Sequence, residues 1–98
     1  MKSPVVLINV FSVPENHEAE FVKMWTKALE LIKNEPGFID AKLHKSLEPN
    51  ARFQFINVAH WESQEAWKAA FDKLQIEEFT QQVPYEQTPA LYQVAVQY

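Results

Sequence analysis

The feature that most constrains this chain is a candidate strand that is apolar on both of its faces. The segment from Val5 to Val13 is rich in β-branched residues and is followed by Pro14, a pattern typical of a β-strand. Its apolar side chains occupy odd positions (Val5, Leu7 and Phe11) as well as even positions (Val6, Ile8 and Val10). Because successive side chains of a strand point to opposite faces, both faces of a sheet that contains this segment must be covered.

A second candidate strand, from Phe53 to Trp61, has the same property. One face carries Phe53, Phe55, Asn57, Ala59 and Trp61, and the other carries Gln54, Ile56, Val58 and His60. Helices packed on one face of the sheet would leave more apolar surface on the other than a monomer usually tolerates. We therefore expect a homodimer whose subunits pack sheet face against sheet face.

The pattern between and after these strands predicts two amphipathic helices. Apolar residues at positions 21, 24, 25, 28, 29 and 32 indicate the first helix, which is ended by Pro36 and Gly37. The second helix follows Ser63, and Trp67, Ala70, Phe71 and Leu74 recur in it at helical spacing.

The remaining segments complete the fold. We predict further strands over residues 38–46 and 91–98, and a short helical turn over residues 75–82. The resulting order β-α-β-β-α-β is that of a ferredoxin-like α+β domain, with an antiparallel sheet and both helices on one face. The length of 98 residues fits a single domain over residues 1–98.

Composition excludes several classes of function. The chain has no Cys, which excludes disulfides, thiolate metal sites and cysteine nucleophiles. A formal net charge of -4 argues against a surface for nucleic acid or anionic membranes. No apolar run approaches the ~20 residues of a membrane-spanning helix, and no His and carboxylate spacing indicates a metal site. We interpret the apolar N-terminal segment as a strand rather than a signal peptide, and we expect a cytoplasmic protein.

Two motifs carry a resemblance to a known family. One is Pro36-Gly37-Phe38, and the other is the run NVAHWESQEAW at positions 57–67, which crosses from a strand into the second helix. Together with the βαββαβ order, they resemble the antibiotic biosynthesis monooxygenase family of dimeric α/β barrels. The resemblance implies a homodimer with a pocket between the sheet and helices of each subunit. The best-known members oxidise aromatic phenols, anthrones or quinols with O2 and use no flavin, haem or metal. We therefore expect a small aromatic substrate and no cofactor.

The resemblance also implies site residues. In the cofactor-free anthrone monooxygenases, an Asn and a Trp four residues later contact the substrate, and these positions are Asn57 and Trp61 here. Residues i and i+4 of a strand share a face, so an amide and an indole N–H could together stabilise an oxyanion in the pocket. We assign Asn57 and Trp61 as catalytic residues. The residues expected to contact the substrate are Asn9, Trp25, His44, Phe55 and Trp67, and His44 is a candidate base if the strand register allows it.

Other interpretations of these residues remain open. Asn57 and Trp61 could be a satisfied buried amide and a packed aromatic side chain. Anthrone-oxidising members have an Arg after the second helix, where this chain has Phe79-Thr80-Gln81. The haem-degrading branch uses a His further along the chain, but none follows His60. RNA-recognition motifs share the βαββαβ order, but their glycines and strand-one aromatic residue are missing here.

The main competing hypothesis is a non-catalytic member, either a small-molecule binder or an orphan dimeric α/β-barrel protein. The side chains of Trp25, Phe55, Trp61, Trp67 and Phe71 could fill the space between sheet and helices. The volume of that space discriminates between the hypotheses. An open pocket above about 300 Å³ favours an enzyme, whereas a filled interior favours the non-catalytic hypothesis.

Overall fold

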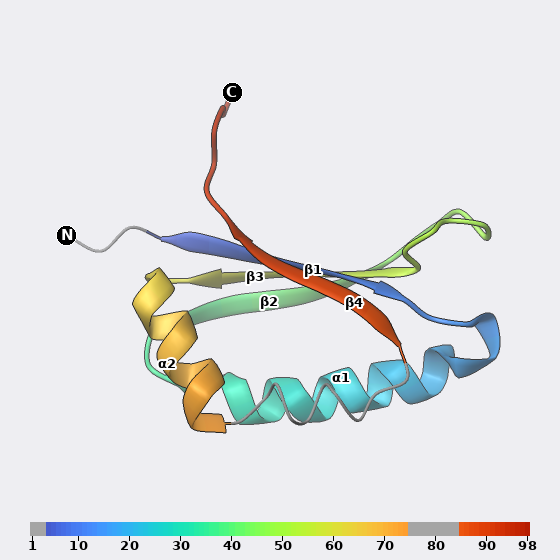
Figure 1. Cartoon of the computed structure of the whole chain (residues 1–98), viewed down its shortest axis with the longest axis horizontal. Coiled ribbons are helices and arrows are strands. Elements are labelled where there is room, and N and C mark those ends of the chain that lie inside the picture. Colours follow the sequence, from blue (N-terminus) through green and yellow to red (C-terminus); the bar gives the residue numbers. More distant parts are fainter. Residues whose placement is uncertain (1–3, 75–84) are drawn as a thin grey trace.

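The computed structural model describes residues 4–74 and 85–98. Its elements are β1 (Val5–Ser12), the 3-10 helix η1 (Glu15–His17), α1 (Glu18–Ile32), β2 (Phe38–Lys45), β3 (Phe55–Trp61), α2 (Gln64–Leu74) and β4 (Glu86–Tyr92). The strands form one antiparallel sheet in the order β2-β3-β1-β4 (Figure 1). The ferredoxin-like βαββαβ fold predicted from the sequence is confirmed.

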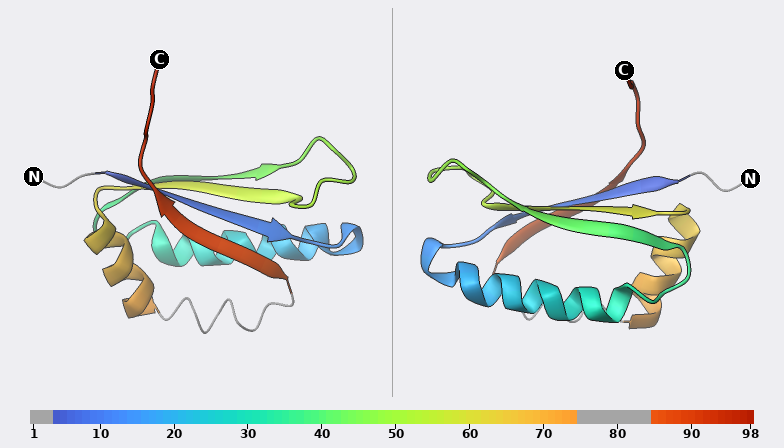
Figure 2. Two further views of the ribbon diagram at one scale, coloured as in Figure 1. Left: turned by 45° about the horizontal axis from the view of Figure 1, so that its top comes forward. Right: turned by 180° about the vertical axis from the view of Figure 1, so that it is seen from behind.

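Both helices lie on the same side of the sheet (Figure 2). In β1 the buried side chains are the odd ones, Val5, Leu7 and Phe11, which pack toward the helices. The even positions point to the opposite side, which we call the open face. Within the described ranges, no helix is both long and apolar enough to cross a membrane.

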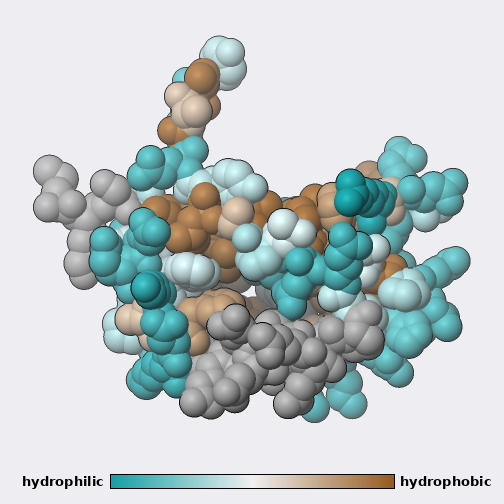
Figure 3. Space-filling view, in the orientation of Figure 1, coloured by the Kyte–Doolittle hydropathy of each residue, from teal (hydrophilic) through white to brown (hydrophobic). Residues whose placement is uncertain are grey.

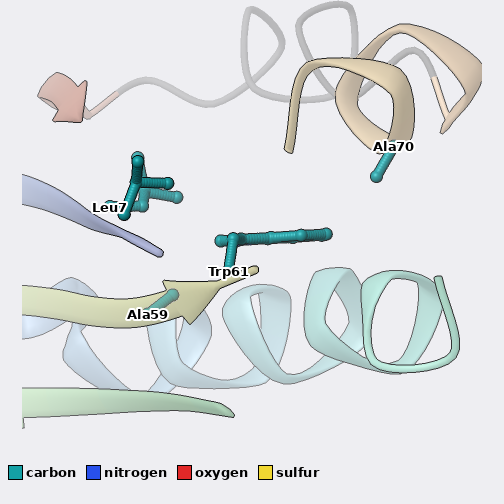
Figure 4. Close-up of a cluster of buried hydrophobic side chains, with 5 residues drawn as sticks. Leu7, Ala59, Trp61 and Ala70 are labelled. Carbon is teal, nitrogen blue, oxygen red and sulfur yellow. The ribbon is translucent and has the colours of Figure 1, made fainter. Parts of the chain in front are cut away.

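The core between the sheet and the helices is divided into two apolar clusters. The first contains Val5, Leu7, Ala59, Trp61 and Ala70 and joins β1 and β3 to α2 (Figure 4). The second contains Phe11, Val13, Phe21 and Phe55. In the second cluster, the ring centroid of Phe21 lies 4.7 Å from that of Phe11 and 4.8 Å from that of Phe55. Between the clusters, Asn9 of β1 pairs with Asn57 of β3 in the strand register.

The connection from α1 to β2 depends on Gly37. This residue has a φ of +89°, in the region that favours glycine. Its carbonyl oxygen accepts a hydrogen bond of 2.8 Å from the N–H of Glu62, which ties the start of β2 to the end of β3. A Cβ atom at this position would lie 2.4 Å from the Cβ of Ala66 in α2. Glycine is therefore required here by both backbone conformation and packing.

The prediction of the last strand was wrong in its position. β4 covers Glu86–Tyr92 rather than residues 91–98, and residues 93–98 follow it without regular structure. On sequence grounds Pro89 indicates a loop, because proline cannot donate to a strand ladder. However, β4 is at the edge of the sheet, where proline is tolerated. The predicted helical turn over residues 75–82 lies outside the described residues.

Candidate active site

A small cavity lies between the sheet and the two helices. Its volume is about 50 Å³, and its walls come from β1, β2, β3, α1 and α2. Asn57 and three tryptophans, Trp25, Trp61 and Trp67, supply the polar groups among its lining residues. The other lining side chains are aliphatic or aromatic, so any polar group that enters the cavity meets only a few partners.

The strand-to-helix turn at the end of β3 positions the central residues of the cavity. Asn57 lies in the middle of β3, and Trp61 is its last residue. The Trp61 indole is 2% exposed and meets Phe38 edge to face, with ring centroids 5.4 Å apart. Ser63 then caps α2, since its Oγ accepts a hydrogen bond of 3.1 Å from the N–H of Ala66. This cap begins α2 directly after the strand, and α2 brings Trp67 to the same cavity.

The helices contribute the two other tryptophans. Trp25 comes from α1, and Trp67 comes from α2, where it packs against Phe71 with ring centroids 5.1 Å apart. Trp25, Trp67 and Phe71 are all only partly buried. These three aromatic side chains of the helices are therefore less tightly enclosed than Trp61.

Several buried polar atoms around the cavity have no hydrogen-bond partner among the described residues. They are Asn57 Oδ1, Trp61 Nε1, Trp67 Nε1 and, on the neighbouring strand, Asn9 Oδ1. A buried polar group without a partner costs about 1–3 kcal/mol of stability, and such groups are rare in native structures. Two donors and two acceptors without partners among the described residues therefore lie at or beside one apolar cavity, which is large enough for water.

The volume of the cavity distinguishes between two hypotheses, an enzyme with an open pocket and a non-catalytic protein with a filled interior. A volume of about 50 Å³ is well below the about 300 Å³ of a typical ligand pocket, and is sufficient for water. Packed side chains, the three tryptophans among them, therefore leave little free space at this cavity. The open pocket expected of an enzyme is not present in this conformation of the described residues.

The structure brings together four of the seven predicted site residues, since Asn57, Trp61, Trp25 and Trp67 all line the cavity. Phe55 does not line the cavity, because it lies in the second cluster and packs against Phe21. Asn9 is adjacent to Asn57 in the sheet but is not a lining residue. The predicted positions of these two residues as lining residues were therefore wrong, although Asn9 lies only one strand away.

The placement of His44 was also wrong. His44 pairs with Ile56 in the register of β2 and β3, so it lies on the open face, opposite Asn57. The cause is a β-bulge between Phe38 and Asp40, which adds one residue to β2. This extra residue reverses the side of the sheet on which the later residues of β2 point. His44 therefore cannot act as a base in the cavity.

One polar residue near the site was missed on sequence grounds. Gln87 of β4 accepts a hydrogen bond of 3.1 Å from Asn9 Nδ2 through its Oε1. The two prolines at 84 and 89 indicate a loop in this segment, and no motif marks Gln87. Only the pairing of β4 with β1 brings it to the helix side of the sheet.

The family is decided by comparison with known proteins. A model of the antibiotic biosynthesis monooxygenase family matches residues 4–82. The chain belongs to the antibiotic biosynthesis monooxygenase family. A candidate monooxygenase from Shewanella loihica PV-4, whose structure has been solved, is 31% identical in sequence to the present chain. The two structures superpose with a TM-score of 0.87 over 99% of each chain.

Two further proteins are similar to this chain, one in fold and one in sequence. SnoaB from Streptomyces nogalater, a cofactor-independent oxygenase, superposes with a TM-score of 0.78 over 97% of this chain and 96% of SnoaB, at 18% identity. This likeness shows the common fold. The mycobilin-producing heme oxygenase of Mycobacterium tuberculosis (strain CDC 1551 / Oshkosh) is 36% identical over 66 residues, which are 67% of this chain. That match spans 61% of the relative's length.

The similarity to a heme oxygenase raises the question of whether this cavity could hold haem. The chain has three His residues, and none lines the cavity. His44 and His60 lie on the open face, and His17 lies in η1, with its Nδ1 3.4 Å from Glu20 Oε2. Because haem iron needs an axial ligand such as His, these residues do not fit a haem that is ligated by His in the cavity.

Proposed function

We propose that this protein is a cofactor-independent monooxygenase that oxidises a small aromatic phenol, quinol or anthrone with O2. The observation that carries the proposal is a pair of polar atoms at an apolar cavity, Asn57 Oδ1 and Trp61 Nε1, that have no hydrogen-bond partner among the described residues. Membership of a monooxygenase family supports the reaction class.

In the proposed reaction, the substrate supplies the electrons. Loss of a proton from a phenol or the enol of an anthrone leaves an electron-rich anion that can reduce O2. Asn57 and Trp61 would orient the substrate oxygen, and the indole N–H would donate a hydrogen bond to its developing negative charge. One oxygen atom of O2 becomes a ring carbonyl oxygen, and the other leaves as water with the two hydrogens lost by the substrate. The equation balances without an external reductant.

Substrate access requires a change in the cavity. Its volume of about 50 Å³ is too small for an aromatic ring system. Trp67 and Phe71 line the cavity and are only partly buried, in contrast to Trp61. We propose that the substrate enters by displacing these two side chains of α2, while β3 keeps Asn57 and Trp61 in place.

Oxygen consumption tests the proposed function. Purified protein is incubated with a panel of hydroquinones, naphthols and anthrones in an oxygen electrode, and the products are analysed by mass spectrometry with ¹⁸O2. We expect protein-dependent oxygen uptake with at least one compound and one ¹⁸O atom in the product. An uptake rate equal to that of heat-denatured protein for every compound would reject the proposal.

The small volume of the cavity favours a second candidate function, a non-catalytic binder. In that case the same unpartnered groups would hold an aromatic ligand without oxidising it. Binding of panel compounds without oxygen uptake would support this function over the first.

We also propose that two copies of the chain pack open face against open face. Val6, Ile8, Val10, Ile56 and Val58 on this face are only partly buried. A band of apolar side chains is visible along the strands (Figure 3). Residues 93–98 extend from the sheet on the side away from the helices, and Val94 and Val96 in this segment are 66% and 70% exposed (Figure 1). A second copy would cover the open face and give this segment a sheet to lie against.

A charge on the open face is expected to break this dimer. Val58→Glu would place a carboxylate between two apolar sheets and weaken dimerisation by at least about 100-fold. Sedimentation equilibrium measures the mass of the variant and of a control, Leu31→Glu, which places the same charge at an exposed apolar position on α1. We expect a monomer for Val58→Glu and a dimer for Leu31→Glu. A monomeric native protein, or an unchanged mass for Val58→Glu, would contradict the proposal.

A further inference from the structure

A second hollow lies beside α2, where the connection from α1 to β2 packs along this helix. Its volume is about 380 Å³, within the range of about 300–1,000 Å³ that is typical of ligand pockets. Residues of the two motifs at positions 36–38 and 57–67 line it together with residues further along α2. Among its described lining residues it shares only Ala70 with the cavity between sheet and helices. We call this hollow the acidic groove.

Small residues bring the two walls of the acidic groove close together. Ala66, Ala69 and Ala70 of α2 form part of its lining, and a Cβ atom at Gly37 would lie 2.4 Å from Ala66 Cβ. The end of α1 and the whole of α2 lie at the same end of the molecule (Figure 1). The alanines give the groove an apolar part, and the other lining residues include four charged side chains.

The charges of the acidic groove do not balance. Three of its charged side chains are acids, Glu35, Glu62 and Glu65, and one is basic, Lys73. Glu62 and Glu65 are exposed, so their carboxylates are accessible from solvent. The groove therefore carries an excess of two negative charges and favours a ligand of positive charge.

Glu35 distinguishes the groove from an ordinary patch of surface acids. Its side chain is only 9% exposed, and its Oε1 atom is buried without a hydrogen-bond partner among the described residues. Its Oε2 atom lies 3.4 Å from the Nζ atom of Lys73, whose side chain is 71% exposed. An ion pair with so exposed a partner stabilises little, whereas a buried carboxylate oxygen without a donor is unfavourable. Glu35 can therefore accept a further N–H donor in the groove.

The acids of the groove are spread along α2. Glu65 and Lys73 are eight residues apart in this helix, which is about 12 Å along its axis. Glu35 contacts the Lys73 end. In residues 4–74 and 85–98, no three His or acidic side chains are grouped as a bound metal ion would require. Negative charges that are separated in this way fit an elongated cation with a charged group at each end.

We propose that the acidic groove binds a linear aliphatic diamine. One ammonium group would donate a hydrogen bond to Glu35 Oε1, and the other would lie near Glu62 and Glu65. The methylene chain between them would pack on the alanines of α2. Lys73 competes for Glu35 in the free protein, and the ligand would displace its ammonium group. This binding site is separate from the cavity of the proposed function, and neither proposal depends on the other.

Three probes with the same six-carbon chain test the proposal in the native protein. The compound 1,6-diaminohexane has two ammonium groups, hexylamine has one, and hexamethonium has two charged groups without an N–H donor. Affinities are measured by isothermal titration calorimetry with excess MgCl2 in the buffer. We expect one-to-one binding of 1,6-diaminohexane, about ten-fold tighter than either of the others, because only this probe supplies both charges and the donor.

The probes also define the results that would overturn the proposal. Equal affinities for 1,6-diaminohexane and hexamethonium would show attraction by charge alone. Equal affinities for 1,6-diaminohexane and hexylamine would show a site for a single ammonium group, such as that of a lysine side chain. Binding of 1,6-diaminohexane that excess MgCl2 abolishes would show a site for a metal ion.

Substitutions on the two sides of the ion pair are expected to act in opposite directions. Glu35→Gln removes the buried carboxylate and is expected to weaken binding of 1,6-diaminohexane by about ten-fold. Lys73→Gln removes the competing ammonium group and is expected to tighten binding by about three-fold. Glu20→Gln, which makes the same change of charge at the other end of α1, is the matched control and is expected to leave the affinity unchanged.

The opposite signs separate a binding role of Glu35 from a structural one. Glu35→Gln and Lys73→Gln break the same ion pair, so a merely structural role predicts changes of the same sign. The location is checked by ¹H–¹⁵N spectra during the titration, in which the amide signals of Ala66 and Ala69 are expected to move. Affinity changes of the same sign in both variants, or signals that move only on the open face, would overturn the proposal.

Discussion

Trp61→Phe is expected to lower kcat/KM for oxygen-dependent oxidation by about 100-fold, the usual loss when one preorganised hydrogen-bond donor is removed from an oxyanion site. Asn57→Leu is expected to lower kcat/KM as well, because the amide that orients the substrate is lost. Trp61→Phe removes the unpartnered Nε1 donor and keeps an aromatic ring in the cavity. Asn57→Leu removes the amide and keeps a side chain of similar size. The measurement is the initial rate of oxygen uptake with the best compound of the panel.

Stability measurements make this result interpretable. Both substitutions remove a buried polar group that has no partner among the described residues, so their free energy of unfolding should not fall by the cost of a lost hydrogen bond. Lys27→Gln, at an exposed position of α1, serves as a control and is expected to keep native activity. Full activity in both cavity variants would show that Asn57 and Trp61 are core residues only.

The largest effect on stability is expected for Gly37→Ala. An L-residue at a φ of +89° costs about 1–2 kcal/mol, and a methyl group 2.4 Å from Ala66 Cβ adds an overpacking cost of about 1–3 kcal/mol. We expect the free energy of unfolding to fall by about 3 kcal/mol and Tm by about 15 °C. Urea unfolding followed by circular dichroism measures the first quantity, and calorimetry measures the second.

A double substitution separates the two causes. Ala66→Gly removes the methyl group that the new Cβ would meet, so Gly37→Ala should cost less in that background than in the native chain. The difference between the two costs is the steric contribution, and the remainder is the backbone contribution. If Gly37→Ala changes stability by less than about 0.5 kcal/mol, the proposed requirement for glycine is wrong.

Much of the fold could be predicted because its signals are local. The runs of β-branched and aromatic residues in β1 and β3 and the helical spacing of apolar residues in α1 and α2 depend only on neighbours a few residues away. The position of β4 was predicted wrongly because the residues that define this strand are not recognisable from their sequence neighbours. Glu86–Tyr92 contains Pro89, and only its position at the sheet edge makes that proline acceptable.

The part of the candidate site that depends on a single strand could also be predicted from the sequence. Asn57 and Trp61 share a face because both lie on one strand, so their common orientation follows from counting residues. The face of His44 depends on the register between β2 and β3, and the bulge after Phe38 reversed it. Phe55 has the correct parity but lies too far along β3, beside Phe21 rather than the cavity.

The sequence by itself determined the element order, the two-faced sheet and the family, because these follow from periodicity and from the motifs at positions 36–38 and 57–67. Only the tertiary structure decided the volume of the cavity and the meeting of Asn57, Asn9 and Gln87 from three strands. These features depend on strand register and on how tryptophans from different elements fill one space. Neither quantity is encoded in any single segment of the chain.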